Sequence, residues 1–363
     1  QRRLLAALVT AVDAAADTGV EGWQTHVLRA SDGSHYIALA IASTPENPIS
    51  RSPLIVYVRL STALTLPETA LTERSVVREW LAGARIDPRL LPRRGFAVGE
   101  MPAMGAGTIG GGGSATVGSA DLQIMALQRE RARQRKADEE RQRRAALQGA
   151  GVGAAGLLPF EDFDLVTSSA FADGTRAIER ALTAGPGHYH LSVGWVEAAA
   201  KPDKATVRVV RRTLDLPPAL PDEFRVSSVI VADAVSVRGT PYTAAEQRAH
   251  PYAIGPTEIT PARDAVFTRD EQLSIAFQVI NARASEAGKP DVTVTFRITR
   301  LVDAREQQVA TLTPLRYDAT TLPPDFDVRL GHPIIAAMSV PLATLPRGDF
   351  RLHIAATDHP STT

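Results

Sequence analysis

Residues 181–193 read Ala-Leu-Thr-Ala-Gly-Pro-Gly-His-Tyr-His-Leu-Ser-Val, and residues 342–354 read Leu-Ala-Thr-Leu-Pro-Arg-Gly-Asp-Phe-Arg-Leu-His-Ile. Each stretch indicates a strand, a turn rich in Pro and Gly, an aromatic residue, and then apolar residues at every second position. The turn reverses the chain, and the aromatic side chain enters the core at the start of the next strand. This pattern is typical of the closing hairpin of an immunoglobulin-like sandwich. Two copies about 160 residues apart therefore predict two such domains.

The rest of the chain also has the period of β-strands. Val292–Ile298 alternates cleanly between apolar and polar residues, which indicates one buried and one solvated face. Turn residues such as Gly288-Lys289-Pro290-Asp291 separate the strands. We therefore expect a mainly β protein. The predicted strands are Trp23–Arg29, His35–Ile41, Leu54–Leu60, His188–Val196, Thr206–Leu216, Arg225–Ala232, Ala265–Phe267, Leu273–Ile280, Val292–Leu301, Gln308–Leu312 and Phe350–Ala356.

Two segments before residue 99 have a helical pattern. Residues 1–20 predict an amphipathic helix whose apolar face is formed by Leu4, Leu5, Leu8, Val9 and Val12. That face either packs on its own protein or binds a partner, so Leu4, Leu5 and Leu8 are candidate partner contacts. A second, shorter helix is expected from Glu73 to Ala82.

Residues 99–158 differ in composition from the rest of the chain. Glycine-rich stretches at 105–118 and 149–156 flank a segment, 122–147, that is heavy in Arg, Glu and Gln. We interpret the whole piece as an Arg- and Gly-rich helical insertion, either a solvated helix supported by i,i+4 ion pairs or an arm that docks on an acidic partner surface. Its candidate partner contacts are Arg129, Arg131, Arg133, Arg135, Arg141, Arg143 and Arg144.

These patterns give a domain organisation in three parts. An N-terminal helix spans residues 1–20, and a first immunoglobulin-like β-sandwich spans 21–218 with the insertion at 99–158. Pro217-Pro218 and Pro221 mark a boundary, and a second immunoglobulin-like β-sandwich spans 222–363.

Composition excludes several classes of function. The chain has 363 residues, of which 40 are Lys or Arg and 40 are Asp or Glu, so its net charge does not favour nucleic acid or anionic lipid. It has no cysteine, which excludes disulfides, thiolate metal sites and cysteine nucleophiles. No apolar run approaches the roughly 20 residues of a membrane span. The first residue is Gln1 and not Met, so either the sequence starts inside a longer gene product or a leader was removed, and a cleaved secretory leader would leave a start of this kind.

Motifs for cofactors and catalysis are weak. Gly105–Gly110 and Gly151–Gly156 match G-x-G-x-x-G, but neither follows a convincing strand or lies in a βαβ unit, so we predict no dinucleotide or other cofactor. No P-loop, Gly-x-Ser-x-Gly or His-Glu-x-x-His motif occurs. RNA or DNA binding is disfavoured because no aromatic residues interleave with the basic ones. The sequence therefore does not predict an enzyme.

Some residues could hold a metal or a sugar. His188 and His190 share one strand face, but a third ligand is not identifiable, so they are weak metal candidates. Glu161, Asp162 and Asp164 could bind calcium, although the spacing of a calcium loop is missing. Aromatic residues could stack on sugars if they formed an exposed row, or they could be core residues. They are Trp23, Trp80, Trp195, Tyr36, Tyr57, Tyr189, Tyr242 and Tyr252.

The order of these elements resembles a known family. An N-terminal helix is followed by His35–Ile41, Leu54–Leu60, the hairpin 180–196 with Pro-Gly-x-Tyr-x-Leu, Val207–Leu216 and Val226–Ala232. This order resembles the C-terminal β-rich region of bacterial, Acidobacteria-type von Willebrand factor A-related proteins, over residues 1–60 and 160–235 and more loosely to 358. The A domain and its Asp-x-Ser-x-Ser metal motif are missing, so metal-dependent adhesion is not carried over. The resemblance implies a secreted or periplasmic β-rich protein without a known reaction.

The sequence thus predicts a non-enzymatic, exported structural or interaction protein, a subunit of a larger periplasmic or extracellular assembly. A protein partner or self-assembly is expected. A carbohydrate-binding module is the first alternative, and a hydrolase with an unrecognised site is the second.

Overall fold

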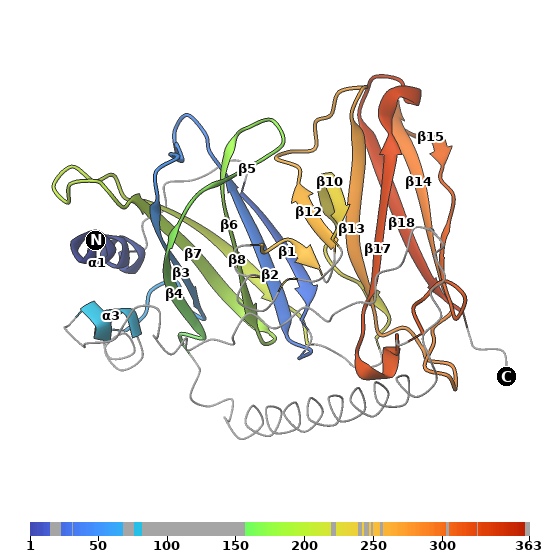
Figure 1. Cartoon of the computed structure of the whole chain (residues 1–363), viewed down its shortest axis with the longest axis horizontal. Coiled ribbons are helices and arrows are strands. Elements are labelled where there is room, and N and C mark those ends of the chain that lie inside the picture. Colours follow the sequence, from blue (N-terminus) through green and yellow to red (C-terminus); the bar gives the residue numbers. More distant parts are fainter. Residues whose placement is uncertain are drawn as a thin grey trace, which may run out of the picture. The chain divides into compact units, whose positions relative to one another are not determined.

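A computed structural model of the chain describes residues 1–14, 23–30, 32–67, 76–81, 157–218, 223–238, 242, 247, 250–254, 257–302, 305–324 and 326–359. The chain divides into two compact units, residues 1–107 with 157–363, and residues 108–156. All the described residues belong to the first unit, whose helices and strands are labelled in Figure 1.

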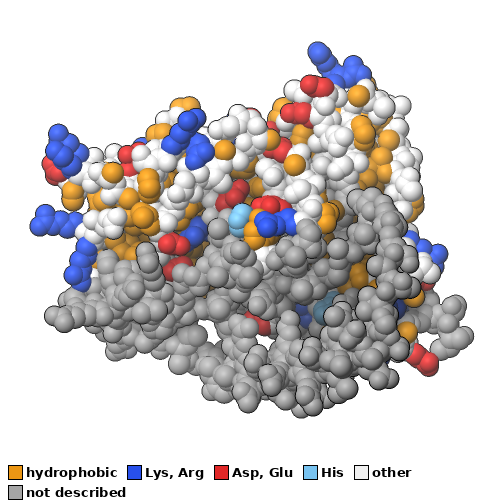
Figure 2. Space-filling model, viewed as in Figure 1, with side chains coloured by type: hydrophobic (Ala, Val, Ile, Leu, Met, Phe, Trp, Pro, Cys, Tyr) orange, Lys and Arg blue, Asp and Glu red, His pale blue; other side chains and the backbone are white. Residues whose placement is uncertain are grey.

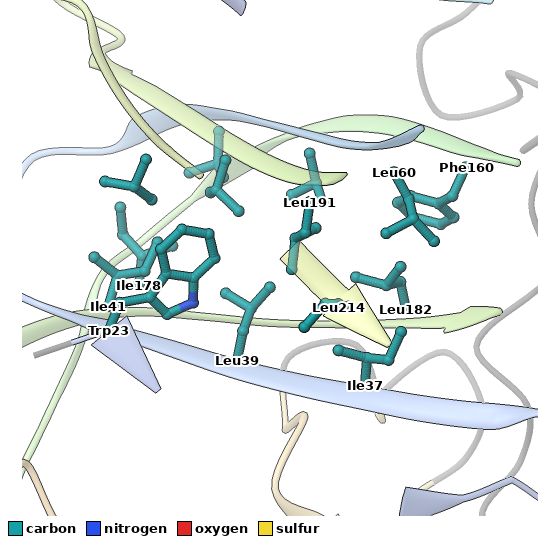
Figure 3. Close-up of a cluster of buried hydrophobic side chains, with 14 of the residues drawn as sticks. Trp23, Ile37, Leu39, Ile41, Leu60, Phe160, Ile178, Leu182, Leu191 and Leu214 are labelled. Atoms are coloured by element: carbon teal, nitrogen blue, oxygen red, sulfur yellow. The ribbon is translucent and has the colours of Figure 1, made fainter. Parts of the chain in front are cut away.

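The N-terminal half of the described chain forms two antiparallel sheets that pack face to face, called here the first sheet pair. One sheet has the order β1-β2-β6-β5 and the other β4-β3-β7-β8. A core cluster that includes Trp23, Leu39, Leu191 and Leu214 fills the space between them (Figure 3). The strands are β1 (Trp23–Arg29), β2 (His35–Ala42), β3 (Leu54–Ser61), β4 (Phe160–Val166), β5 (Ser169–Ala170), β6 (Arg176–Ala184), β7 (Gly187–Glu197) and β8 (Arg208–Leu216).

The C-terminal half forms a second sheet pair. One sheet has the order β11-β12-β10-β13-β17, with β9 also on β13, and in the other β14 pairs with β15, β16 and β18. Phe277 and Phe296 meet edge to face in the core between these sheets. The strands are β9 (Arg225–Val226), β10 (Ile230–Val237), β11 (Ala253–Ile254), β12 (Thr257–Pro261), β13 (Gln272–Ile280), β14 (Val292–Val302), β15 (Arg305–Thr311), β16 (Leu315–Tyr317), β17 (Ile334–Pro341) and β18 (Phe350–Asp358).

The two pairs repeat one topology. The first pair has β1, β2 and β6 as neighbours in one sheet, and the second pair has β10, β13 and β17 as neighbours in the same order, so β1 corresponds to β10. Likewise β4-β3-β7 corresponds to β15-β14-β18, and all these pairings are antiparallel. The hairpin repeat in the sequence marks β7 and β18 as equivalent strands. The first pair has one further strand, β8, on the free side of β7.

A second core joins the two pairs, so the sheet that contains β2 is covered on both faces. Tyr36 and Ala38 of β2 pack with Ile230 and Ala276 of the other pair. The edge strand β1 is also held by side chains from that pair: the hydroxyl of Ser228 accepts the Val27 N–H at 3.0 Å. This double cover explains why every residue of β2 is buried and why its sequence is a nearly continuous apolar run.

Helices cover the outer face of β3. The helix α1 (Arg2–Asp13) packs on β3, β7 and β8, and α3 (Val76–Leu81) lies beside β4 (Figure 1). Two short 3₁₀ turns, η1 (Val328–Leu330) and η2 (Leu342–Thr344), lie on either side of β17. None of the helices in the described ranges has the length and apolar character needed to cross a membrane.

The mainly β prediction is confirmed, and most strand positions agree with it. The prediction of a strand at Ala265–Phe267 is wrong, because these residues lie in the loop between β12 and β13. The expected strand before the second turn is also absent, since residues 342–344 form η2. Residues 225–232 form β9 and the start of β10, and the helix expected at Glu73–Ala82 is α3. Except for Leu157 and Leu158, the insertion at 99–158 lies outside the described residues.

Candidate functional site

The apolar face of α1 packs on the protein's own sheet. Leu4, Leu5 and Leu8 are fully buried in a cluster with Ile55 and Val209. Of the two alternatives for this apolar face, the structure shows the first: the three leucines pack on their own protein and are not available to a partner. The physical reason is that the outer face of β3 and β8 is itself apolar here, and burying both faces together removes them from water.

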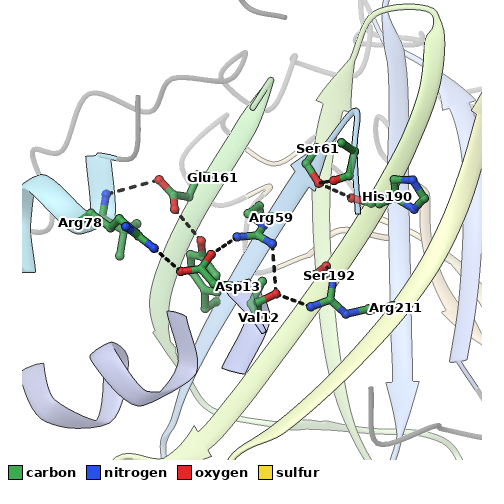
Figure 4. Close-up of polar contacts among 12 residues, drawn as sticks. Val12, Asp13, Arg59, Ser61, Arg78, Glu161, His190, Ser192 and Arg211 are labelled. Atoms are coloured by element: carbon green, nitrogen blue, oxygen red, sulfur yellow. Dashed lines mark hydrogen bonds and ion pairs between the residues drawn. The ribbon is translucent and has the colours of Figure 1, made fainter. Parts of the chain in front are cut away.

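A buried polar network holds the end of α1 (Figure 4). The carbonyl of Val12 accepts hydrogen bonds from the guanidinium groups of Arg59 and Arg211. The carboxylate of Asp13 pairs with Arg59 and, at 2.6 Å, with Nη2 of Arg78. Cations are favourable at a helix C-terminus because the last carbonyls carry partial negative charge. The network therefore has a structural role, and sequence reasoning missed it because its members are far apart in the chain.

The acidic strand considered for calcium is committed to other contacts. Glu161 is buried and accepts a hydrogen bond from the Tyr57 hydroxyl at 2.5 Å. Burial, followed by the charge of Glu161, holds the pKa of Tyr57 well above its usual range. Asp164 pairs with Arg180 at 3.2 Å. These carboxylates stabilise the first sheet pair, and they do not converge on one point.

The histidine pair lies at the exposed end of β7. The rings of His188 and His190 are 5.8 Å apart and edge to face. His188 Nδ1 is 2.5 Å from Oδ1 of Asp215, and both side chains are largely exposed. Within the described part of the chain, no group of three or more metal-ligating side chains is found. The geometry therefore supplies two neighbouring imidazoles and one carboxylate without a closed coordination site.

Two groups of sequence candidates fall outside the described residues. They are the two glycine motifs and the seven arginines of the insertion, Arg129, Arg131, Arg133, Arg135, Arg141, Arg143 and Arg144.

The aromatic side chains that the structure describes do not form an exposed row. Six of them are buried core residues: Trp23, Tyr36, Tyr57, Tyr189, Trp195 and Tyr252. Tyr242 is partly exposed and stacks on His250, with ring centroids 4.0 Å apart. The side chain of Trp80 lies outside the described residues. The arrangement that a sugar-stacking surface needs is therefore not built by the described aromatic residues.

A cavity of about 300 Å³ lies where the two pairs meet, and its lining includes Ser34, His35, Asp215 and Ser228. These are residue types of a hydrolase, but Ser34 and Asp215 contact other partners: the hydroxyl of Ser34 donates to Asp32 at 2.6 Å, and Asp215 pairs with His188. The Nε2 atom of His35 lies 2.8 Å from the carbonyl oxygen of Pro217 and donates to it, which leaves Nδ1 as the acceptor of that ring. Burial is the largest cause that lowers the pKa of His35, and nearby arginines lower it further.

A larger, apolar cavity of about 880 Å³ opens between the two sheets of the second pair. Its walls come from Val231 and Ile275 on one sheet and from Leu352 and Ile354 on the other. Hydrophobic side chains also reach the surface over the strands of this pair (Figure 2). The charged residues of its lining are Arg269, Asp270, Arg347 and Asp349, and no histidine lines the cavity.

Sequence reasoning missed this cavity. The only signal for it is the hairpin repeat, which identifies β18 as the counterpart of β7. The opening itself depends on which strands cover β18, and that is a tertiary property.

Comparison with known proteins adds no assignment: no family model matches the chain, and no curated protein matches its sequence.

Proposed function

We propose that this protein is a non-enzymatic structural or interaction subunit of a larger assembly, exported to the periplasm or the cell exterior. The observation that carries the proposal is the apolar cavity between the sheets of the second pair. Its volume lies within the range of ligand and binding clefts, and exposed apolar surface of this kind marks a place where another molecule binds.

The chemistry of the cavity favours binding over catalysis. Most of its lining residues are aliphatic or aromatic, and its charged lining residues are two arginines and two aspartates. A catalytic cleft needs a base or nucleophile among converging polar groups. The apolar lining offers contact area and few groups that could transfer a proton.

The proposal includes two immunoglobulin-like sandwiches. It is supported by the repeated strand order, in which a sheet of β1, β2 and β6 faces a sheet of β4, β3, β7 and β8. Domains of this architecture commonly serve as interaction modules, which is an argument from fold alone.

The test is native mass spectrometry of the protein isolated from its source at native concentration. We expect a defined complex with other chains or copies. Two variants in the loop after β12 localise the contact: Phe267 lines the cavity, whereas its neighbour Val266 is 82% exposed and does not. Phe267→Asp should dissociate the complex and Val266→Asp should leave it intact. A monomer from the wild-type source would overturn the proposal.

A further inference from the structure

The equivalent strands β7 and β18 differ in what covers their free side. In the first pair β7 lies between β3 and β8. In the second pair β18 pairs with β14, and no strand among the described residues pairs with its other edge. The strand that would correspond to β8 is thus missing from the described part of the second pair.

Burial follows this difference at matching positions of the repeat. Tyr189, Leu191 and Val193 of β7 are 7%, 0% and 0% exposed, and all three point into the core. Their counterparts in β18 also face the core, but they are only partly buried. Those counterparts line the 880 Å³ cavity: they are Phe350, Leu352 and Ile354. The cavity therefore occupies the place that β8 fills in the first pair.

The backbone of β18 is oriented for a further strand. The N–H of Leu301 donates to the carbonyl of Asp349, and the N–H of His359 donates to that of Asp291. Both bonds follow the register in which Val292 lies opposite Asp358, and both join odd-numbered residues. The odd-numbered residues of β18 are therefore the ones that form hydrogen bonds with β14. The N–H and C=O groups of the even-numbered residues consequently point to the open edge, where the carbonyl of Asp358 already accepts a hydrogen bond from Arg283 at 3.0 Å.

We propose that the open edge of β18 receives an extended β-strand from another protein chain, and that alternate apolar side chains of this strand fill the cavity. This inference rests on the proposed function and names the chemistry of the partner. The main-chain hydrogen bonds provide affinity, and the alternate side chains, which all enter the core, provide specificity.

The first pair shows what such a strand looks like. Val210, Leu214 and Leu216 of β8 point into the core, two or four residues apart. From the same strand, Arg212 reaches across to the carbonyl of Trp23 on β1, which closes that side of the first pair. The incoming strand would lie over β10, the counterpart of β1.

The surroundings of the cavity favour an extended segment over a second folded copy. The sheet under the cavity continues beyond β10 to β12 and β11. A second copy would have to bring its own sheet into that space, whereas a single strand needs only the edge.

Disulfide trapping tests this proposal, because the chain has no native cysteine. Ala355→Cys is placed in the full chain, at an exposed position on the outer face of β18. The probes are a synthetic peptide of residues 207–217, which contain β8, and the same peptide with Arg212→Val. Each peptide carries Val209→Cys. In the first pair Val209 of β8 lies opposite Gly194 of β7, and Ala355 is the residue of β18 that corresponds to Gly194. Such a non-hydrogen-bonded pair has its Cα atoms within disulfide range.

Two matched controls fix the site and the register. Gln307→Cys places the thiol on β15, which is also an exposed edge strand but does not line the cavity. A peptide with Val210→Cys in place of Val209→Cys points its thiol to the other face of the sheet. Under an oxidising glutathione buffer, the Ala355→Cys chain should form a disulfide adduct with the Val209→Cys peptides. We expect at least tenfold more of this adduct than in either control. The amide of Leu352 should become protected from hydrogen exchange as the peptide binds.

Three outcomes would overturn the proposal. Equal trapping in the controls would show nonspecific contact. A disulfide dimer of the Ala355→Cys chain in place of the peptide adduct would assign the edge to a second copy. Protection of the Leu352 amide in the isolated chain would mean that the edge is already covered. If native mass spectrometry still finds a complex in any of these cases, the proposed function stands and only the strand site is rejected.

Discussion

His26 couples the stability of the two sheet pairs to pH. It lies on β1 with 8% of its surface exposed, and its Nδ1 is 3.1 Å from the hydroxyl of Tyr252 in the second half of the chain. Burial, and to a lesser extent the charge of Arg212, lowers the pKa of His26 from 6.5 to about 4. The folded protein therefore disfavours a proton that the unfolded chain accepts below pH 6.5.

The sign and size of the effect follow from this difference in pKa. Between pH 6.5 and about 4 the unfolded state binds more protons than the folded state, so stability is full above pH 6.5 and falls as pH approaches 4. One pKa unit is worth about 1.4 kcal/mol, so the whole loss is about 3 kcal/mol, of which about 2 kcal/mol is lost between pH 7.5 and pH 5. For a protein with a stability of about 5–15 kcal/mol, this is a measurable fraction.

Urea unfolding at pH 7.5 and pH 5, monitored by tryptophan fluorescence, measures this loss. Trp23 lies in the core of the first pair, so its emission reports on that core. His26→Gln can still form a hydrogen bond with the Tyr252 hydroxyl but cannot take up a proton, so its loss of stability should be about 2 kcal/mol smaller than that of the wild type. His188→Gln is the matched control, because that ring is largely exposed, and it should behave like the wild type. Equal pH dependence in the wild type and His26→Gln would refute the reasoning.

Three further predictions concern the two sheet pairs. Gly194→Val should destabilise the fold by about 1–3 kcal/mol through overpacking, because a Cβ added at Gly194 would lie 3.0 Å from the side chain of Leu8 in α1. Gly185→Ala is the control in the same urea assay, and it should have little effect because the space around Gly185 is open. Arg59→Met should cost about 3 kcal/mol because it removes a fully buried partner of Asp13; a loss below 1 kcal/mol would contradict a role in anchoring α1. Residue-resolved hydrogen exchange of the isolated chain should show faster exchange for the amides of the even-numbered residues of β18 than for those of the odd-numbered residues, which bond to β14. Uniform protection along β18 would contradict an open edge.

Local pattern accounts for most of what the sequence could predict. The strand Val292–Leu301 was predictable because a strand's side-chain period is two residues and is visible in a short window, and Leu54–Leu60 was predictable because it is rich in β-branched and aromatic residues. The exception is instructive: Ala265–Phe267 is apolar but forms no ladder, and a short apolar run alone does not specify pairing.

The cavity and the buried polar contacts both depend on segments that are far apart in the chain. The burial of His26 depends on Tyr252, and the end of α1 depends on Arg59 and Arg211, which are 47 and 199 residues from Val12. The amphipathic pattern of α1 showed which face is apolar, but it could not show whether that face meets this chain or another.

The sequence by itself determined the mainly β architecture and the repeat of one hairpin, because both are carried by alternation and turn residues that act locally. Only the tertiary structure decided that, among the described strands, β7 is covered on both edges and β18 on one, because strand pairing joins segments that are distant in the chain. The same pattern of apolar residues is therefore a closed core in one half of the molecule and the wall of an open cavity in the other.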